Sequence, residues 1–184
     1  FMSSNSKAVA NLDGVYDDWI ELYNPSDVAI DIGGYYLSDN DKNKTKWRFP
    51  DNTVIEPNGY LVVWASGKDK IGANGELHTN FSISQDGEPL LLTYSNGKDV
   101  INFIPPVFIS QNYSYGRLTD GGSDWGFFDT ENASAGRSNN DSVSGLLPFT
   151  FVPVFSHEGG FYNEDFYLEL SAQPGHRIYY TLDG

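Results

Sequence analysis

Short runs of apolar residues alternate with clusters of Gly, Asn, Asp and Pro along most of this chain of 184 residues. Such punctuation, roughly every ten residues, is typical of strands joined by tight turns, and no stretch keeps the apolar period of a three-turn helix. We therefore predict an all-β fold. The expected strands cover residues 19–24, 35–38, 46–50, 60–65, 79–83, 89–94, 99–103 and 112–117. Strands with one buried and one wet face close most readily into two facing sheets, which predicts a β-sandwich.

One hairpin has a clear turn signal. Asn96 and Gly97 separate two apolar runs, and Asn-Gly readily supplies the positive φ angles of a tight two-residue turn. We expect residues 89–103 to form an antiparallel hairpin.

The composition divides the chain into three parts. Residues 1–129 carry most of the strand pattern, and residues 130–145 are small, polar and turn-rich, which predicts a linker. Residues 146–184 resume the strand pattern with about three strands, where a sandwich needs roughly seven, so we expect a partial second β-sandwich. An apolar sheet face without a cover is unfavourable in water, so we expect this C-terminal part to be disordered, to dock on the first domain or to self-associate between molecules.

Charge and composition exclude several classes of function. The formal net charge is −14, which repels phosphate backbones, so we expect no nucleic-acid partner. No run approaches the ~20 apolar residues of a membrane span, which predicts no membrane insertion. Without cysteine, the chain has no disulfides and no thiolate sites.

Three segments together resemble one family. They read WIELYNPSDVAIDIGGYYLSD (residues 19–39), TKWRFPDNTVIEPNGYLVVWASG (45–67) and EPLLLTYSNGKDVI (88–101). This order is similar to the lamin tail domain, the immunoglobulin-like sandwich of nuclear lamins that also occurs in bacterial surface proteins. The resemblance implies an immunoglobulin-like β-sandwich over residues 1–129, with Tyr115, Gly116 and Arg117 in its last strand and Trp125 nearby. Bacterial members open with one more strand before a segment like residues 2–5, so we expect an exposed sheet edge here.

The C-terminal part resembles a second family. Residues 153–184, PVFSHEGGFYNEDFYLELSAQPGHRIYYTLDG, are similar to the start of the chitobiase/β-hexosaminidase C-terminal-like domain. The resemblance implies that only the first half of this domain is present. Bacterial chains with both modules often carry a kinase-like domain as well, which implies a larger parent protein.

One loop carries weak calcium candidates. Asp39, Asp41 and Asn43 stand at alternate positions, from which oxygen ligands can converge on a hard cation. Counted from Asp39, however, the sixth and twelfth positions are Lys44 and Pro50 rather than Gly and Glu. Calcium and a solvated loop closed by Asx turns both remain open, and no other cofactor is predicted.

No set of residues predicts an enzyme. Asp13 lies in a turn signal, and Asp17 and Asp18 are adjacent, so on a strand they would point to opposite faces. Ser123 lies in GGSDWG, which does not satisfy the Gly-x-Ser-x-Gly elbow of serine hydrolases. The histidines stand alone without a zinc-ligand spacing: His78, His157 and His176.

The aromatic content leaves two binding functions open. Most Trp and Phe residues lie on predicted strands, but strand alternation sends some tyrosine rings outward, where they could stack on sugars. These are Tyr35, Tyr36, Tyr113, Tyr115, Tyr179 and Tyr180. We expect a non-catalytic structural or adhesion module of a secreted or cell-surface bacterial protein, with a protein or cell-surface glycan as partner. The alternative is a carbohydrate-binding module attached to a larger carbohydrate-active or kinase-like protein.

Overall fold

The computed structural model describes residues 1–2, 4–140, 154–157, 160, 162–171, 178 and 180. The chain forms two compact units, Phe1–Leu146 and Leu147–Gly184, which are described separately. Every regular element of the described residues is a strand except one short 3-10 helix, Ala73–Gly75, so the predicted all-β fold is confirmed. Within the same residues, no helix has the length and apolar character needed to cross a membrane.

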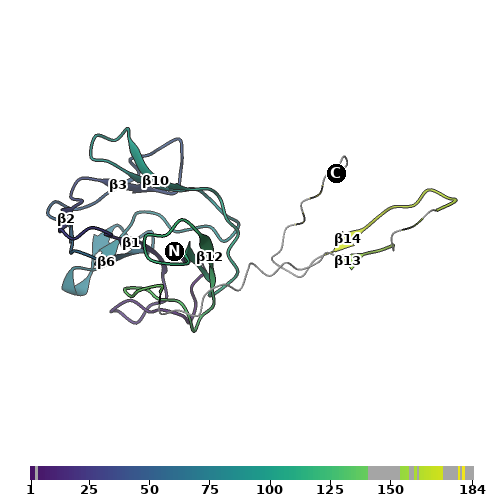
Figure 1. Ribbon diagram of the computed structural model, residues 1–184, viewed down its shortest axis with the longest axis horizontal. Helices are drawn as coiled ribbons and strands as arrows, with labels where there is room; N and C mark the ends of the chain where they lie inside the picture. The colour runs from purple at the N-terminus through teal and green to yellow at the C-terminus, as the bar shows by residue number, and fades with distance from the viewer. Residues whose placement is uncertain are drawn as a thin grey trace. The chain divides into compact units, whose positions relative to one another are not determined.

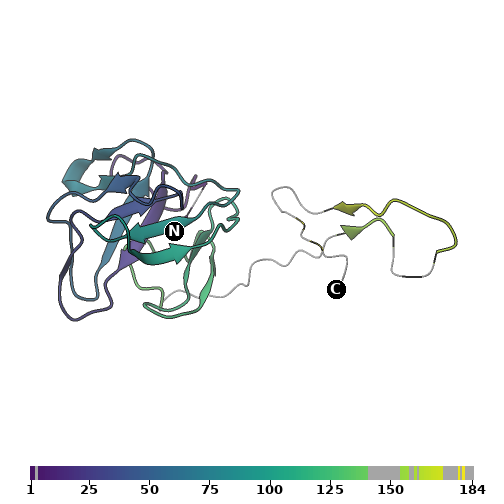
Figure 2. The same cartoon turned by 90° about the horizontal axis from the view of Figure 1, so that it is seen from above.

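The first unit is a two-layered β-sandwich (Figure 1). One sheet has the order β1-β6-β8-β7, with bounds Asp18–Tyr23, Tyr60–Ala65, Leu77–His78 and Lys70–Ile71. The facing sheet has the order β10-β9-β3-β4, with bounds Val100–Ile104, Leu90–Thr93, Tyr36–Ser38 and Trp47–Arg48. Two shorter pairs complete it: β2 (Ile30–Asp31) with β5 (Val54–Ile55), and β11 (Ser114–Arg117) with β12 (Trp125–Phe128). Figure 2 shows the strands of the two layers from above.

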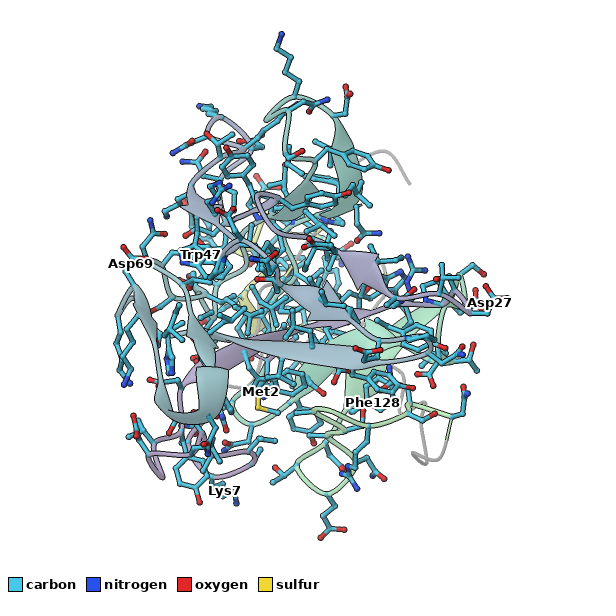
Figure 3. The ribbon with its side chains drawn as sticks, turned by 90° about the vertical axis from the view of Figure 1, so that its left-hand side faces the viewer. Met2, Lys7, Asp27, Trp47, Asp69 and Phe128 are labelled. Atoms are coloured by element: carbon cyan, nitrogen blue, oxygen red, sulfur yellow. The ribbon has the colours of Figure 1, made fainter. Side chains whose placement is uncertain are left out.

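The core lies between the sheets because strand alternation turns one side of every strand inward. Phe49 is completely buried and meets the ring of Trp47 edge to face at 4.9 Å. Ile20 from β1, Val63 from β6 and Leu90 from β9 fill the space around them. Met2 and Phe128 lie among packed side chains, whereas Lys7, Asp27 and Asp69 lie at the surface (Figure 3).

Two sequence predictions need correction. Residues 79–83 were expected to form a strand, but the strand in this region, β8, ends at His78. The Thr79 hydroxyl donates to the Phe81 carbonyl at 2.6 Å, and this local hydrogen bond bends the chain. Residues 89–103 do form the expected antiparallel hairpin. Its turn is wider than two residues, because Tyr94 pairs with Asp99 and the Asn96 side chain accepts from the Lys98 amide at 2.9 Å.

The segment predicted as a linker is packed over its first residues. Ala133 and Ser134 are each 5% exposed, and Ala133 joins Met2, Trp19 and Trp64 in a second apolar cluster on the outer face of β1 and β6. Small side chains let this segment lie close against the rings, so a polar composition did not keep it away from the sheet. Residues 141–145 lie outside the described part of the chain.

The second unit contains one short antiparallel pair, β13 (Val154–Phe155) with β14 (Leu170–Ser171). The His157 ring stacks on Phe166 with the ring centres 4.1 Å apart. Several apolar side chains are exposed, among them Val154 at 66% and Tyr167 at 98%. The apolar surface of this unit is therefore largely uncovered in the described residues.

Candidate functional site

A cavity of about 470 Å³ opens between the two sheets of the first unit. Strands β1 and β11 bound it on one side, and β9 and β10 bound it on the other. Its interior wall is mainly aliphatic, with side chains of Ile20, Leu22, Leu37, Leu90, Leu92 and Ile104. An apolar hollow with a few polar groups at its rim is a typical ligand site, so this cavity is the candidate site.

Met2 lies between β1 and β11 and holds them together. Its amide donates to the Trp19 carbonyl at 2.9 Å, and the Trp19 amide donates back to the Met2 carbonyl at 3.1 Å. On the other side, the Tyr115 amide donates to the Phe1 carbonyl at 2.8 Å. The edge of β1, expected to be exposed, is therefore covered at Trp19, while Ile20–Asn24 line the cavity.

Aromatic rings form the wall beside β11. The rings of Tyr115 and Trp125 stack at 5.3 Å, and Phe127 lies 4.9 Å from Tyr115. The guanidinium of Arg117 lies 4.9 Å above the Trp125 ring, which is a cation–π distance. Tyr115, Gly116 and Arg117 do share one strand, but it is not the last strand as expected, because β12 begins at Trp125, follows β11 and pairs with it.

Two acidic side chains stand at the rim of the cavity. Burial raises the pKa of Glu21 to about 7, and the nearby Asp120 carboxylate adds to the effect. Asp120 accepts hydrogen bonds from the Tyr60 hydroxyl at 2.6 Å, the Ser138 hydroxyl at 2.5 Å and the Asn139 amide at 2.9 Å. Burial opposes ionisation of Asp120, but these donors outweigh it and lower its pKa.

Residues 129–140, here called the strap, cross the outer face of β1 and β6 beside this rim. The Gly136 amide donates to the Glu21 carboxylate, and the Asn139 side chain donates to the Arg117 carbonyl at 2.7 Å. The strap itself begins with Asp129, whose carboxylate accepts from the Asn132 amide at 3.0 Å. Sequence patterns did not indicate this segment as part of a site, because its contacts are with residues far away in the chain.

The loop with the calcium candidates is closed by its own contacts. The Lys46 ammonium donates to both oxygens of Asp39, at 2.6 and 2.7 Å. The Asp41 and Asn43 side chains are exposed, and the Ser38 hydroxyl donates to the Asn43 carbonyl at 2.6 Å. In the described part of the chain, no three His, Asp or Glu side chains are grouped to hold a metal ion.

The other acidic candidates are separated by their partners. Lys70 donates to Asp13 at 2.9 Å, and this bond lowers the pKa of Asp13. Lys68 donates to Asp17 at 2.6 Å, whereas Asp18 accepts from the Asn5 amide at 3.1 Å. Burial raises the pKa of Asp18 to about 6. These carboxylates thus serve as separate links between loops.

The histidine and serine candidates are also placed apart. His78 is completely buried, and its Nδ1 lies 3.0 Å from the Ser66 hydroxyl, a contact that sequence patterns did not predict. Burial lowers the pKa of His78, which favours the neutral ring. Ser123 is exposed beside Asp124 at 3.3 Å, and His157 belongs to the second unit. His176 lies outside the described residues.

The tyrosines expected on outer faces are mostly half-buried. This holds for Tyr35, Tyr36, Tyr113 and Tyr115, and Tyr35 packs against the core. Tyr180 is 71% exposed, and Tyr179 lies outside the described residues.

Comparison with protein families matches residues 3–104, which are 102 of the 184 residues, to the Lamin Tail Domain family. A comparison with curated proteins gave no match. The matched residues span β1 to β10 and so include both facing sheets of the sandwich. Immunoglobulin-like folds of this kind usually serve as structural and binding modules rather than as catalysts. Since the match covers more than half of the chain and the strands form the expected two-sheet sandwich, this chain belongs to the lamin tail domain family.

Proposed function

We propose that this chain is a non-catalytic structural and adhesion module of a secreted or cell-surface bacterial protein, and that its partner is another protein. One observation carries the non-catalytic part. Three of the acidic side chains singled out in the sequence form ion pairs that link separate segments: Asp13 with Lys70, Asp17 with Lys68 and Asp39 with Lys46. Side chains used in this way stabilise a scaffold and do not converge on a reacting atom.

The charge supports a protein partner over a nucleic acid. Residues 1–140, which include both sheets, hold 19 acidic and 10 basic side chains. Lamin tails are proposed to contact DNA through basic residues, and this excess of acid opposes such contacts. A mobility-shift titration at low salt should therefore show no tight DNA binding, and tight binding would contradict this part of the proposal.

Surface localisation has a direct test. An antibody against the first unit should label intact cells of the producing bacterium, with a cytoplasmic protein as the control that is labelled only after permeabilisation. If this chain were labelled only after permeabilisation, the proposed location would be wrong.

A second candidate function is glycan binding, with this chain as the carbohydrate-binding module of a larger carbohydrate-active or kinase-like protein. The stacked Tyr115 and Trp125 rings line the cavity together with Arg117 and Asp120, and such a mixture of rings and polar groups can hold a sugar. A glycan array discriminates the two functions. Binding that is lost in Trp125→Ala and kept in Trp47→Phe would favour the glycan function over the protein partner.

For the second unit, we propose a chitobiase C-terminal-like domain that associates with a second copy. The exposed Val154, Phe155 and Tyr167 support this, because an apolar surface in water is stabilised by contact. Sedimentation of the full chain should show dimers that weaken in Phe155→Ser and persist in the control Tyr94→Ser. A monomer at all concentrations would contradict self-association.

A further inference from the structure

Strands β1 and β11 face each other across a space that is one strand wide, here called the gap. Each strand is paired on its other side, β1 with β6 and β11 with β12. Met2 forms antiparallel bridges to Trp19 of β1 and to Ser114 of β11, so all three segments belong to one sheet at this point. Two strands that flank a third lie about 9–10 Å apart, which is twice the strand spacing. Residues 1–2 therefore occupy one end of the gap, and β1 and β11 run parallel to each other along it.

The cavity extends along the gap. Its lining includes residues 20–24 and the whole of β11, Ser114–Arg117. Among the described residues, only residues 1–2 pair with β1 or β11 from this side. The facing sheet forms an aliphatic floor below the gap, with Leu90, Leu92 and Ile104. The cavity thus has the width of a strand within one sheet and an apolar floor in the other.

The backbone of β1 presents hydrogen-bonding groups to the gap. Trp19 exchanges two hydrogen bonds with Met2, at 2.9 and 3.1 Å, so its amide and carbonyl face this side. Alternate residues of a strand face the same edge, and the register of β1 with β6 runs without a bulge. The amides and carbonyls of Glu21 and Tyr23 therefore face the gap as well. Within the described residues, neither of these two amides donates a hydrogen bond.

The backbone of β11 presents fewer groups. The Tyr115 amide donates to the Phe1 carbonyl at 2.8 Å, so Arg117, two residues further on, also faces the gap. The Arg117 carbonyl accepts from the Asn139 side chain of the strap at 2.7 Å, which leaves its amide for a partner. A strand placed in the gap can thus form about five backbone hydrogen bonds, most of them with β1.

The two faces of the gap favour different side chains. Ile20 and Leu22 pack with the core, so a strand residue beside Leu22 points toward the aliphatic floor. A strand residue beside Glu21 points to the other face, where the Glu21 carboxylate accepts from the Gly136 amide and Asp120 stands at the same rim. In a strand antiparallel to β1, the first of these residues precedes the second. The gap therefore fits an apolar residue followed by a basic one.

We propose that the gap binds an extended segment of a partner protein as an added strand, antiparallel to β1 and β11, with apolar residues inward and basic residues outward. This inference rests on the proposed function, because it names the part of the partner that is bound. Backbone pairing and the apolar floor supply affinity, and the carboxylates select a basic segment. A second copy of this chain is disfavoured as the occupant, since it has 25 acidic against 11 basic side chains.

NMR titration of the full chain with a short peptide that alternates valine and lysine tests the proposal. At about ten times its Kd, the peptide should raise the hydrogen-exchange protection of the Glu21 and Tyr23 amides by about 10-fold. The Ile20 and Leu22 amides face β6 and should keep their protection. This alternation along one strand distinguishes strand addition from other binding in the cavity.

Two control peptides separate backbone pairing from charge. A valine–lysine peptide with a central proline lacks a backbone donor and should bind at least about 10-fold more weakly. A peptide that alternates valine and glutamate should also bind more weakly, because Glu21 and Asp120 repel it. Glu21→Gln should weaken binding of the valine–lysine peptide about 3- to 10-fold, whereas Glu131→Gln, at an exposed strap carboxylate, should leave it unchanged. If Glu21→Gln does not fold, the valine–glutamate peptide decides the role of charge.

A chain with the valine–lysine peptide fused directly ahead of Phe1 locates the binding site, because residues 1–2 already lie in register with both strands. The fused strand should fill the gap and abolish binding of the free peptide.

The proposal would be overturned if the full chain did not bind the valine–lysine peptide, if residues 20–23 all gained equal protection, or if the fused chain bound the free peptide as before. Equal binding of the lysine and glutamate peptides would also reject it. Labelling of intact cells does not involve the gap, so failure of the titration with normal labelling leaves the proposed location intact. Failure of labelling alone identifies an error in the proposed function.

Discussion

Replacing Asn24 by aspartate should be among the most destabilising isosteric changes in this fold. Asn24 is 2% exposed at the end of β1. Its Nδ2 donates to the carbonyls of Val28, Ile55 and Glu56 at 2.8, 3.0 and 3.1 Å, and its Oδ1 accepts from the Ser26 amide at 3.0 Å. One side chain therefore joins the end of β1, the following turn and the end of β5.

The magnitude follows from this arrangement. Asn24→Asp replaces the donor by an ionised oxygen that faces three carbonyl oxygens in a buried place. An orphaned buried polar group costs about 1–3 kcal/mol, and a charged one costs more, so we expect a loss of about 3–4 kcal/mol of unfolding free energy at pH 7. Repulsion and burial raise the pKa of the introduced carboxyl, so the penalty should shrink as the pH falls and the protonated oxygen becomes a donor.

Urea unfolding followed by tryptophan fluorescence measures both effects. The matched control is Asn80→Asp, because Asn80 is exposed and donates once, to the Lys46 carbonyl at 2.8 Å. The control should lose less than about 1 kcal/mol, as exposed substitutions usually do. The reasoning from buried donors would be refuted if Asn24→Asp lost no more unfolding free energy than the control. It would also be refuted if the loss of unfolding free energy were the same at pH 4 and pH 7.

Three further predictions concern single positions. Phe49→Ala should cost about 3–5 kcal/mol in urea unfolding, because the ring is completely buried, and a cost below about 2 would mean that the core collapses around the gap. Gly97→Ala should cost about 1 kcal/mol more unfolding free energy than Gly136→Ala. Both glycines have positive φ, but only at Gly97 would a Cβ lie 2.9 Å from the Thr45 methyl. Equal losses of thermal stability in the two variants would contradict this steric effect. The pKa of His78 measured by NMR should lie below 6.5, because burial favours the neutral ring. The stability that the buried neutral ring contributes is therefore fully present above pH 6.5 and is lost as the pH falls through the pKa of the folded state. A midpoint above 6.5 would show that burial does not hold the ring neutral.

The strands could be predicted well where apolar residues dominate four or more positions between turn signals. The segments around Trp19, Tyr60 and Leu90 have this composition, and each forms a strand within about one residue of the expected bounds. The pattern failed at Thr79, where a hydroxyl that bonds to its own backbone outweighs strand propensity. It also missed the two-residue strands such as β2 and β5, because so short a segment has no detectable period.

The candidate site was much less predictable than the strands. The calcium loop drew attention because its oxygens are close in the chain, but the contact of Asp39 with Lys46 spans a hairpin and is decided by strand register. The strap was expected to be a linker, since small polar residues carry no periodic signal. Its hydrogen bond to Glu21 joins positions that are 115 residues apart, since the donor is the Gly136 amide.

The order of apolar and turn-forming residues by itself determined that this chain is all-β, has a hairpin over residues 89–103 and belongs with a known family of sandwiches. The local pattern is enough to predict these features, because strands and turns depend on residues that are close together in the sequence. Only the tertiary structure decided which groups meet at the cavity rim, why the pKa of Glu21 is raised while donors lower that of Asp120, and that residues 129–140 cover a sheet. Such properties depend on desolvation and on partners distant in sequence, and no local pattern records either of them.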